Sequence, residues 1–264
     1  MSVIPLSALD LLMAACLVAG LAGLTVCMRL GLGRSILTAA LRTTVQLLLV
    51  GLVLKAVFAA AHPLLILAMA LLMLAVAARE VAMRQKRRFA GGWGFGMGAA
   101  SMFVSSFSVT ALALVALVGV QPWYAPQYAV PLLGMLLGNT MNGIALGLDR
   151  LTSTAWREAR VIEARLLLGQ TWFEAVHDIR RESIRAGLIP IVNAMAVAGL
   201  VSLPGMMTGQ ILAGSPPLEA VKYQILIMFL IAAGTGFGTL AAVVLGARRL
   251  FDDRHRLRID RLVR

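Results

Sequence analysis

The chain has 264 residues, of which 60% are hydrophobic and 14% are charged, and its formal net charge is +12 at pH 7. Soluble domains carry about 25% charged residues, so this composition excludes an ordinary soluble globular protein. The basic residues lie in connections that flank long apolar runs, which indicates membrane topology and contact with anionic lipid heads rather than nucleic-acid binding.

Seven apolar segments follow one another along the chain. They are Leu6–Met28, Ile36–Phe58, Leu64–Ala78, Met97–Val120, Ala129–Leu148, Leu188–Ala213 and Ile225–Gly246. A helix needs about 20 apolar residues to cross the roughly 30 Å hydrocarbon layer of a bilayer. The segments leave no room for a folded soluble domain. We therefore expect one all-α transmembrane permease domain over residues 1–264, with about seven transmembrane helices.

The connections between these segments alternate in charge. All but two of the 24 Lys and Arg residues fall on one side of the predicted membrane, the exceptions being Lys55 and Lys222. Because Lys and Arg accumulate on the cytoplasmic side of membrane proteins, the pattern predicts an outer N-terminus and a cytoplasmic C-terminus. The expected location is a cell membrane crossed several times, and in a bacterium the inner membrane.

The longest polar connection, residues 149–187, lies on the predicted cytoplasmic side. Its acidic and basic residues nearly balance, which favours a folded insert over an extended basic arm. The pattern predicts two short helices around Gly169, the first at about Thr154–Leu168 and the second at Trp172–Ile184.

Local signals support both helices of this insert. Ile162, Leu166 and Leu167 fall near one face of the first helix, an amphipathic arrangement. Thr171 and Glu174 have the spacing of a capping box, in which each side chain accepts from the other residue's backbone N–H. We expect this box to start the second helix.

The same insert contains a spaced motif. Glu163-Ala164-Arg165 is followed after three residues by Gly169 and after nine more by Ile179. This spacing resembles the EAA loop of ABC-transporter permeases, although Arg165 stands where that loop has a second alanine. In that superfamily the helix at the loop docks into a cleft of the ATPase subunit, so the resemblance implies a cytoplasmic ATPase partner. The residues expected at the contact are Glu163, Ala164, Gly169, Thr171, Trp172 and Phe173.

Longer stretches carry a narrower resemblance. They are Gly134-Met135-x2-Gly138-Asn139-x-Met141, Leu167–Thr171, Asp178–Pro190, Gly199–Gly209, Ala213-Gly214 and Lys222–Ile225. In order and spacing, these stretches are similar to the FetB-type family of iron-export ABC transporter permeases. The resemblance implies the membrane subunit of a transporter, a homodimer with two ATPase subunits, that moves iron or another metal ion outward.

The chemistry missing from the sequence also bears on function. No Asp, Glu or His lies in the middle of a predicted span, whereas ion-coupled carriers usually need such a group. The chain lacks the G-x4-G-K-[ST] phosphate loop, so an ATPase would be a separate chain. No catalytic motif, cofactor site or zinc-ligand spacing is present. The alternatives are a self-sufficient ion channel or secondary metal carrier and, less favoured, an intramembrane enzyme.

Polar and thioether side chains inside the spans are the candidates for a translocation path. They are Gln46, Met135, Asn139, Asn142, Met206, Met207, Thr208 and Gln210. Amide and hydroxyl oxygens can replace part of a cation's hydration shell, and thioethers favour soft ions. Helix-to-helix hydrogen bonding and gap filling are the competing interpretation. Pro204-Gly205 interrupts the sixth span, which leaves open one kinked helix or a helix followed by a re-entrant segment.

Overall fold

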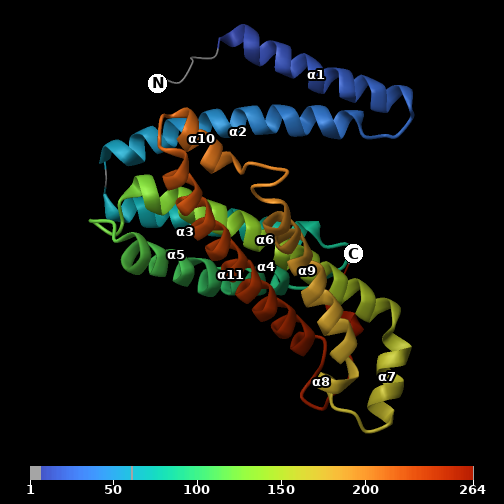
Figure 1. Cartoon of the computed structure of the whole chain (residues 1–264). Helices are drawn as coiled ribbons and strands as arrows, with labels where there is room; N and C mark the ends of the chain where they lie inside the picture. Colours follow the sequence, from blue (N-terminus) through green and yellow to red (C-terminus); the bar gives the residue numbers. More distant parts are fainter. Residues whose placement is uncertain (1–6, 61, 264) are drawn as a thin grey trace.

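Long helices account for most of the chain in the computed structural model, which describes residues 7–60 and 62–263 (Figure 1). The α-helices are α1 Ala8–Cys27, α2 Gly33–Ala60, α3 Pro63–Arg84, α4 Trp93–Met102, α5 Ser108–Leu112, α6 Pro126–Arg157, α7 Ala159–Leu167, α8 Trp172–Ala175, α9 His177–Val197, α10 Gly205–Leu212 and α11 Pro217–Arg249. The π-helical turns η1 (Phe103–Phe107) and η2 (Ala113–Val118) continue α4 and α5 as one helical run. Strands β1 (Arg88–Phe89) and β2 (Leu262–Val263) pair antiparallel, and η3 (Ile259–Arg261) precedes β2.

The predicted all-α membrane fold is confirmed. Among the described residues, six helical runs are long and apolar enough to cross a membrane: α1, α2, α3, the run over 93–118, α6 and α11. The first predicted span begins at Leu6, which lies outside the described residues, and its described part is α1.

The sixth predicted span, Leu188–Ala213, is not a continuous helix. The second half of α9 ends at Val197, residues 198–204 form a non-helical loop, and α10 begins at Gly205 after Pro204. Gly199 has a φ of +81°, and its N–H donates to the carbonyl oxygen of Ser202 at 2.9 Å, which closes the turn. The segment is therefore a helix, a loop and a short helix, and both helices pack on α11.

The core is built around α6, which packs against α3, α9 and α11. Its fully buried residues include Leu136, Ile144, Leu148 and Leu151. Close approach of α9 and α11 to α6 depends on small residues, because a methyl carbon added at Gly143 would lie 2.7 Å from Thr235 and Thr239 side-chain atoms. A methyl carbon added at Gly147 would likewise lie 2.9 Å from Val243 Cγ2, so both glycines let α11 approach α6 closely.

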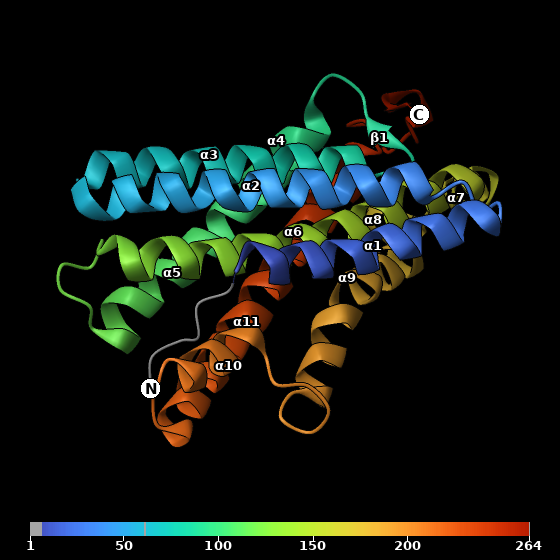
Figure 2. The same ribbon diagram turned by 90° about the horizontal axis from the view of Figure 1, so that it is seen from above.

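Helices α1 and α2 form a hairpin beside this core, and α1 lies apart from the other helices (Figures 1 and 2). Ala22 and Thr25 are buried where α1 meets the start of α2. Near its other end, α2 reaches the core through Val57, which packs with Ile66 and Val130.

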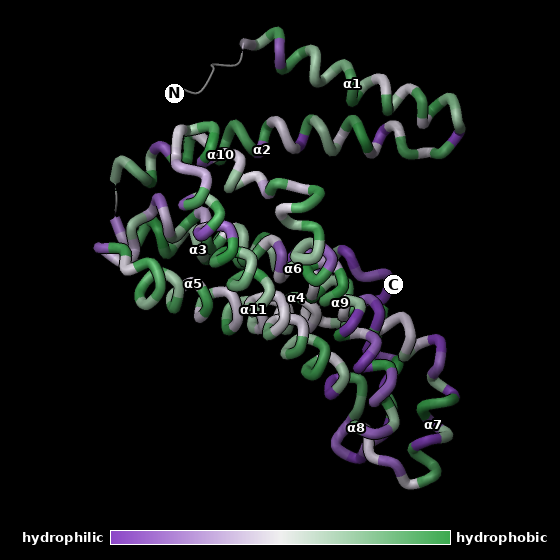
Figure 3. Tube along the Cα trace, in the orientation of Figure 1, coloured by the Kyte–Doolittle hydropathy of each residue, from purple (hydrophilic) through white to green (hydrophobic). Residues whose placement is uncertain are grey.

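The basic connections lie at one end of the molecule. The α1–α2 turn, β1, α7 and the C-terminal segment share that end, whereas the α2–α3 turn and the loop before α6 share the opposite end (Figure 2). Hydrophilic residues concentrate at α7, α8 and the C-terminal segment (Figure 3). This arrangement agrees with the charge asymmetry in the sequence and identifies which end we expect in the cytoplasm.

Reporter fusions test that orientation. A reporter that is active only outside the cytoplasm is expected to work when fused after Tyr124 or Pro217, because both positions belong to the end with few basic residues. Fusions after Arg88 or Ala175 are expected to be inactive. Activity of the Ala175 fusion would contradict the orientation, since it would place α7 and α8 outside.

Candidate coupling element and translocation cavity

The helices of the polar insert, residues 149–187, have other boundaries than the two helices predicted around Gly169. Helix α6 continues to Arg157, so the expected helix at Thr154–Leu168 is instead the end of α6 and α7. Glu158 separates them with a φ of −103° and a ψ of 22°. The expected helix at Trp172–Ile184 is likewise α8 and the start of α9, separated at Val176.

Contacts from distant parts of the chain explain the extension of α6. The Thr152 hydroxyl donates to the carbonyl oxygen of Arg87 at 2.7 Å, and the Arg87 guanidinium lies 3.6 Å from the centre of the Trp156 ring. The connection after α3 therefore supports α6 beyond the apolar segment.

A short turn joins α7 to α8. Gly169 has a φ of +89°, a left-handed conformation that favours glycine after a helix end. The capping box is confirmed: the Glu174 carboxylate accepts from the Thr171 N–H at 2.8 Å, and the Thr171 hydroxyl accepts from the Glu174 N–H at 3.4 Å. The hydrogen bonds from the Thr171 backbone and then its hydroxyl lower the pKa of Glu174.

Arg165 holds the two arms of this turn together. Its guanidinium donates to the carbonyl oxygen of Ala175 and to the Asp178 carboxylate, both at 3.1 Å. Hydrogen bonds from His177 and then Arg165 lower the pKa of Asp178. The residue that departs from the EAA pattern thus closes the turn, a contact that an alanine side chain cannot make.

The tip of the turn is apolar and exposed. Leu167 is 89% exposed and Leu168 is 84% exposed, so the prediction that Leu167 shares the buried face of Ile162 was wrong. Within α7, Leu167 lies about 140° around the helix from Ile162, whereas Leu166 lies about 40° from it. Only Ile162 and Leu166 therefore pack on the core. Phe173 is also exposed on one face, while the Arg180 guanidinium lies 3.4 Å from its ring centre.

The predicted contact residues gather around this tip. Glu163, Ala164, Gly169, Thr171 and Phe173 are exposed there. Trp172 is half-buried instead: its backbone N–H donates to His255 Nδ1 at 3.2 Å, and the centre of its ring lies 6.1 Å from that of Phe251. Trp172 therefore fastens the C-terminal segment to α8. We call residues 159–175, which comprise α7, the turn and α8, the coupling element.

A separate cavity lies between α6, α10, α11 and η2, with a volume of about 430 Å³. It brings together three of the predicted path residues, Met135, Met206 and Gln210. Within the described chain, Gln210 Oε1 is buried and has no hydrogen-bond partner. Three polar side chains that sequence reasoning missed, Gln127, Tyr128 and Tyr223, also line the cavity.

The other predicted path residues do not line this cavity. Gln46 is exposed on α2, and Met207 lies on α10 beside Met206. The Thr208 hydroxyl donates to the carbonyl oxygen of Pro204 at 3.3 Å.

Asn139 and Asn142 make contacts typical of membrane helices. Asn139 Nδ2 donates to the carbonyl oxygen of Met135 at 2.8 Å, and Asn142 Oδ1 accepts from Arg84 at 2.6 Å. Glu80 lies 3.7 Å from Arg84 and 3.3 Å from Arg42. Over residues 7–60 and 62–263, no group of three or more His, Cys, Asp and Glu side chains is placed to hold a metal ion.

Comparison with known proteins assigns the family. The model of the uncharacterised protein family UPF0014 matches residues 8–251. The chain belongs to the UPF0014 family. A UPF0014 membrane protein of Synechocystis is 44% identical over 232 residues, covering 86% of this chain and 87% of that protein.

Two further relatives carry names that refer to function. The "Probable iron export permease protein FetB" of Escherichia coli is 34% identical over 241 residues, covering 89% of this chain and 88% of that protein. "Protein ALUMINUM SENSITIVE 3" of Arabidopsis thaliana is 29% identical over 204 residues, covering 77% and 72%. No solved structure matches the chain significantly.

The resemblance to the FetB-type family is thus confirmed for this UPF0014 member. Its apolar helices and its UPF0014 relatives from bacteria make it a multi-pass membrane protein.

Proposed function

We propose that this UPF0014 member is the permease subunit of an ABC transporter that exports iron or another metal ion, using ATP hydrolysed by a separate subunit. The observation that carries the proposal is the coupling element, whose exposed apolar tip, Leu167 and Leu168, lies at the basic end of the molecule. Adjacent apolar side chains that are this exposed form the kind of patch through which a protein contacts a partner or a membrane surface.

The helices on either side of the coupling element support this role. Helix α6 leads from the opposite end of the molecule to the element, and α9 leads from the element back to the loop before α10 (Figure 1). Ile179, Ser183 and Gly187 are buried on the face of α9 that packs against α6. A displacement of the element by an ATPase would therefore move α9 and, through the loop, the α10 residues Met206 and Gln210.

The loop at residues 198–204 supports a homodimer. Along the direction in which α2 runs, Figure 2 shows this loop part-way between the two ends of that helix. Two of its side chains are almost fully exposed, Leu200 at 87% and Val201 at 84%. Non-helical backbone at membrane depth is tolerated only where protein covers it or it lines a cavity. A second copy of the chain is the cover that we propose.

The cavity supports a metal cargo of intermediate or soft character. Met135 and Met206 offer thioether sulfurs, and Gln210 offers an unpaired amide oxygen, without a carboxylate that would hold a cation tightly. The name of the Escherichia coli relative FetB refers to iron export, so iron is the first cargo to test.

Co-purification tests the proposed subunit role. We expect an ATPase to co-purify with the tagged chain, and the reconstituted complex to hydrolyse ATP faster when Fe(II) is added. Metal transport by the chain alone in vesicles, without ATP, would contradict the proposal and favour the channel or carrier alternative.

Substitutions in the cavity test the path. Gln210→Leu and Met206→Leu are each expected to reduce metal-stimulated ATP hydrolysis about tenfold, since each removes a ligand while preserving bulk. Met207→Leu is the matched control on the same helix, because Met207 does not line the cavity. Full stimulation in both cavity variants would assign α10 a structural role only.

A further inference from the structure

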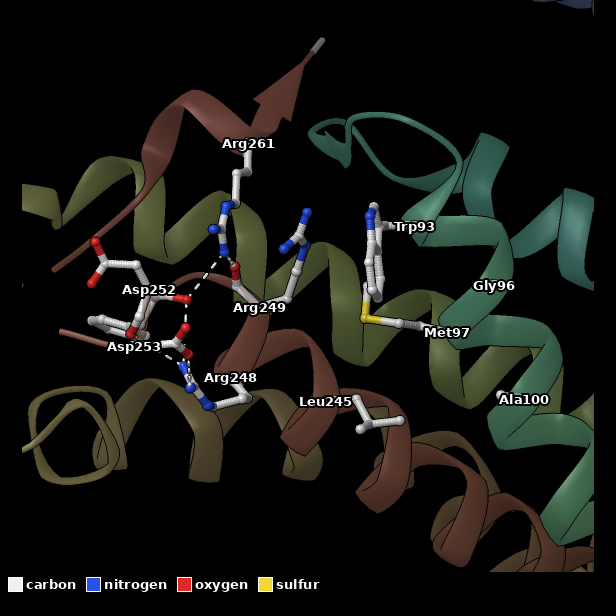
Figure 4. A pocket seen from close by; sticks show the side chains of 11 residues that line it. Trp93, Gly96, Met97, Ala100, Leu245, Arg248, Arg249, Asp252, Asp253 and Arg261 are labelled. Carbon is white, nitrogen blue, oxygen red and sulfur yellow. Dashed lines mark hydrogen bonds and ion pairs between the residues drawn. The ribbon is translucent and has the colours of Figure 1, made fainter. Parts of the chain in front are cut away.

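A second pocket, of about 530 Å³, opens at the basic end between α4, α11 and the C-terminal segment (Figure 4). The residues that line it are Trp93, Gly96, Met97, Ala100, Leu245, Arg248, Arg249, Phe251, Asp252, Asp253 and Arg261. None of them belongs to the coupling element or to the cavity beside α10.

Two of its three arginines have partners within the protein. Arg248 pairs with the Asp253 carboxylate at 2.9 Å. Arg261 donates to the carbonyl oxygens of Arg249 and Phe251 at 2.8 and 3.1 Å, which fixes the C-terminal segment over the pocket.

Arg249 is the exception. In the described part of the chain, no carboxylate lies within ion-pair distance of its guanidinium, and its buried Nε has no hydrogen-bond partner. Its guanidinium lies 4.2 Å from the centre of the Trp93 ring, and Figure 4 shows Arg261 directed toward the same space. An unpaired, partly desolvated guanidinium beside a second one is a site for an anion.

The nearby carboxylates do not neutralise this site. Asp253 is paired with Arg248, and Asp252 accepts the Arg256 N–H at 2.9 Å and Arg256 Nε at 2.7 Å. The backbone hydrogen bond from Arg256 is the largest cause that lowers the pKa of Asp252.

The position of the pocket suggests the source of the anion. Trp93 begins one membrane-spanning run and Arg249 ends another, so both lie where a span meets the membrane surface. Tryptophan is enriched at that level. Toward the membrane the pocket is lined by Met97, Ala100 and Leu245, and Leu245 is 47% exposed on the outer face of α11.

We propose that this pocket binds the phosphate group of an anionic phospholipid. Arg249 and Arg261 would contact the phosphate, and the acyl chains would run along Ala100 and Leu245. Guanidinium groups match phosphate oxygens in two-point contacts, and basic pockets at the cytoplasmic ends of membrane helices suit anionic headgroups. The Arg248 guanidinium, which lines the pocket, lies 5.6 Å from the centre of the Trp172 ring. A bound lipid would therefore also stabilise the contact between the C-terminal segment and α8.

Native mass spectrometry of the purified full-length chain tests the proposal. Titration with phosphatidylglycerol is expected to give a bound lipid at concentrations about tenfold lower than phosphatidylcholine does. Arg249→Gln is expected to weaken phosphatidylglycerol binding about tenfold, because it removes a charge-assisted contact. Arg249→Lys is expected to retain part of the preference, since the charge remains.

Two further variants separate charge from fold. Gly96→Leu keeps every arginine. Apart from the neighbouring backbone of α4, no described atom lies within 4 Å of a Cβ added at Gly96. The leucine side chain would therefore enter the pocket without a clash and reduce lipid binding. Arg254→Gln removes an exposed arginine of the same segment that does not line the pocket, so binding should be unchanged.

Three outcomes would overturn the assignment. One is equal binding of phosphatidylglycerol and phosphatidylcholine. Another is an equal loss of phosphatidylglycerol binding in Arg254→Gln and Arg249→Gln. The third is displacement of phosphatidylglycerol by inorganic phosphate at matched concentration, which would identify a free anion as the ligand.

Discussion

Replacing Leu167 and Leu168 together by aspartate is expected to abolish ATPase association and ATP-driven transport while the protein still folds and inserts. Both side chains are almost fully exposed at the tip of the coupling element, so the folded chain loses no buried contact. Burial of one leucine at an interface is worth about 1.5–3 kcal/mol, so losing both weakens binding by more than about 100-fold. The measurement is the amount of ATPase that co-purifies with the chain.

Leu218→Asp is the matched control for that experiment. Leu218 is also exposed, but it lies at the start of α11, at the opposite end of the molecule. Retention of the ATPase is expected in this variant. If the variant with both aspartates retains the ATPase as well as the wild type does, the coupling element is not the docking site.

Local patterns in the sequence predicted the elements that depend on neighbouring residues. The capping box of Thr171 and Glu174 and the helix end at Gly169 follow from short-range hydrogen bonding and backbone conformation, and both are present. Apolar run length likewise located the six helical runs that are long enough to cross a membrane, because bilayer thickness sets a minimum length. It also selected Leu188–Ala213, which the loop at residues 198–204 interrupts.

Contacts between distant residues were beyond such patterns. Trp172 was expected at an external contact, but it packs on Phe251 and His255, about 80 residues away in the chain. The continuation of α6 depends on Arg87, which reaches Thr152 and Trp156. The sequence has no signal for these pairings, since each residue alone fits an exposed helix or loop.

Some of the residues that line the cavity beside α10 could be predicted from the sequence, and others could not. Met135, Met206 and Gln210 could be selected because they are polar or soft groups near glycines and a helix break. Gln127, Tyr128 and Tyr223 were missed because they lie near span ends, where aromatic and polar residues are usual. Only the packing of α6, α10 and α11 brings the two sets together.

The contact between α9 and α6 provides the second large expected effect. A methyl carbon built on Gly187 would lie 2.5 Å from the carbonyl oxygen of Gly143 and 2.6 Å from Thr239 Cγ2. Backbone cannot yield as a flexible side chain can, so Gly187→Ala is expected to separate α9 from α6 at a cost of about 1–3 kcal/mol. The measurement is the unfolding midpoint in detergent, followed by the fluorescence of the four tryptophans.

Gly138→Ala introduces the same methyl group into α6 at a position where, apart from the neighbouring backbone of α6 itself, no described atom lies within 4 Å. Because alanine favours helix over glycine by about 1 kcal/mol, this control is expected to be neutral or slightly stabilising. The two variants are also expected to differ in transport, because α9 connects the coupling element to the loop before α10. If α9 carries motion from the coupling element to α10, Gly187→Ala should keep ATPase association yet reduce metal-stimulated hydrolysis, whereas Gly138→Ala should keep both. Equal stability and equal stimulation in the two variants would show that close packing of α9 on α6 is not needed for coupling.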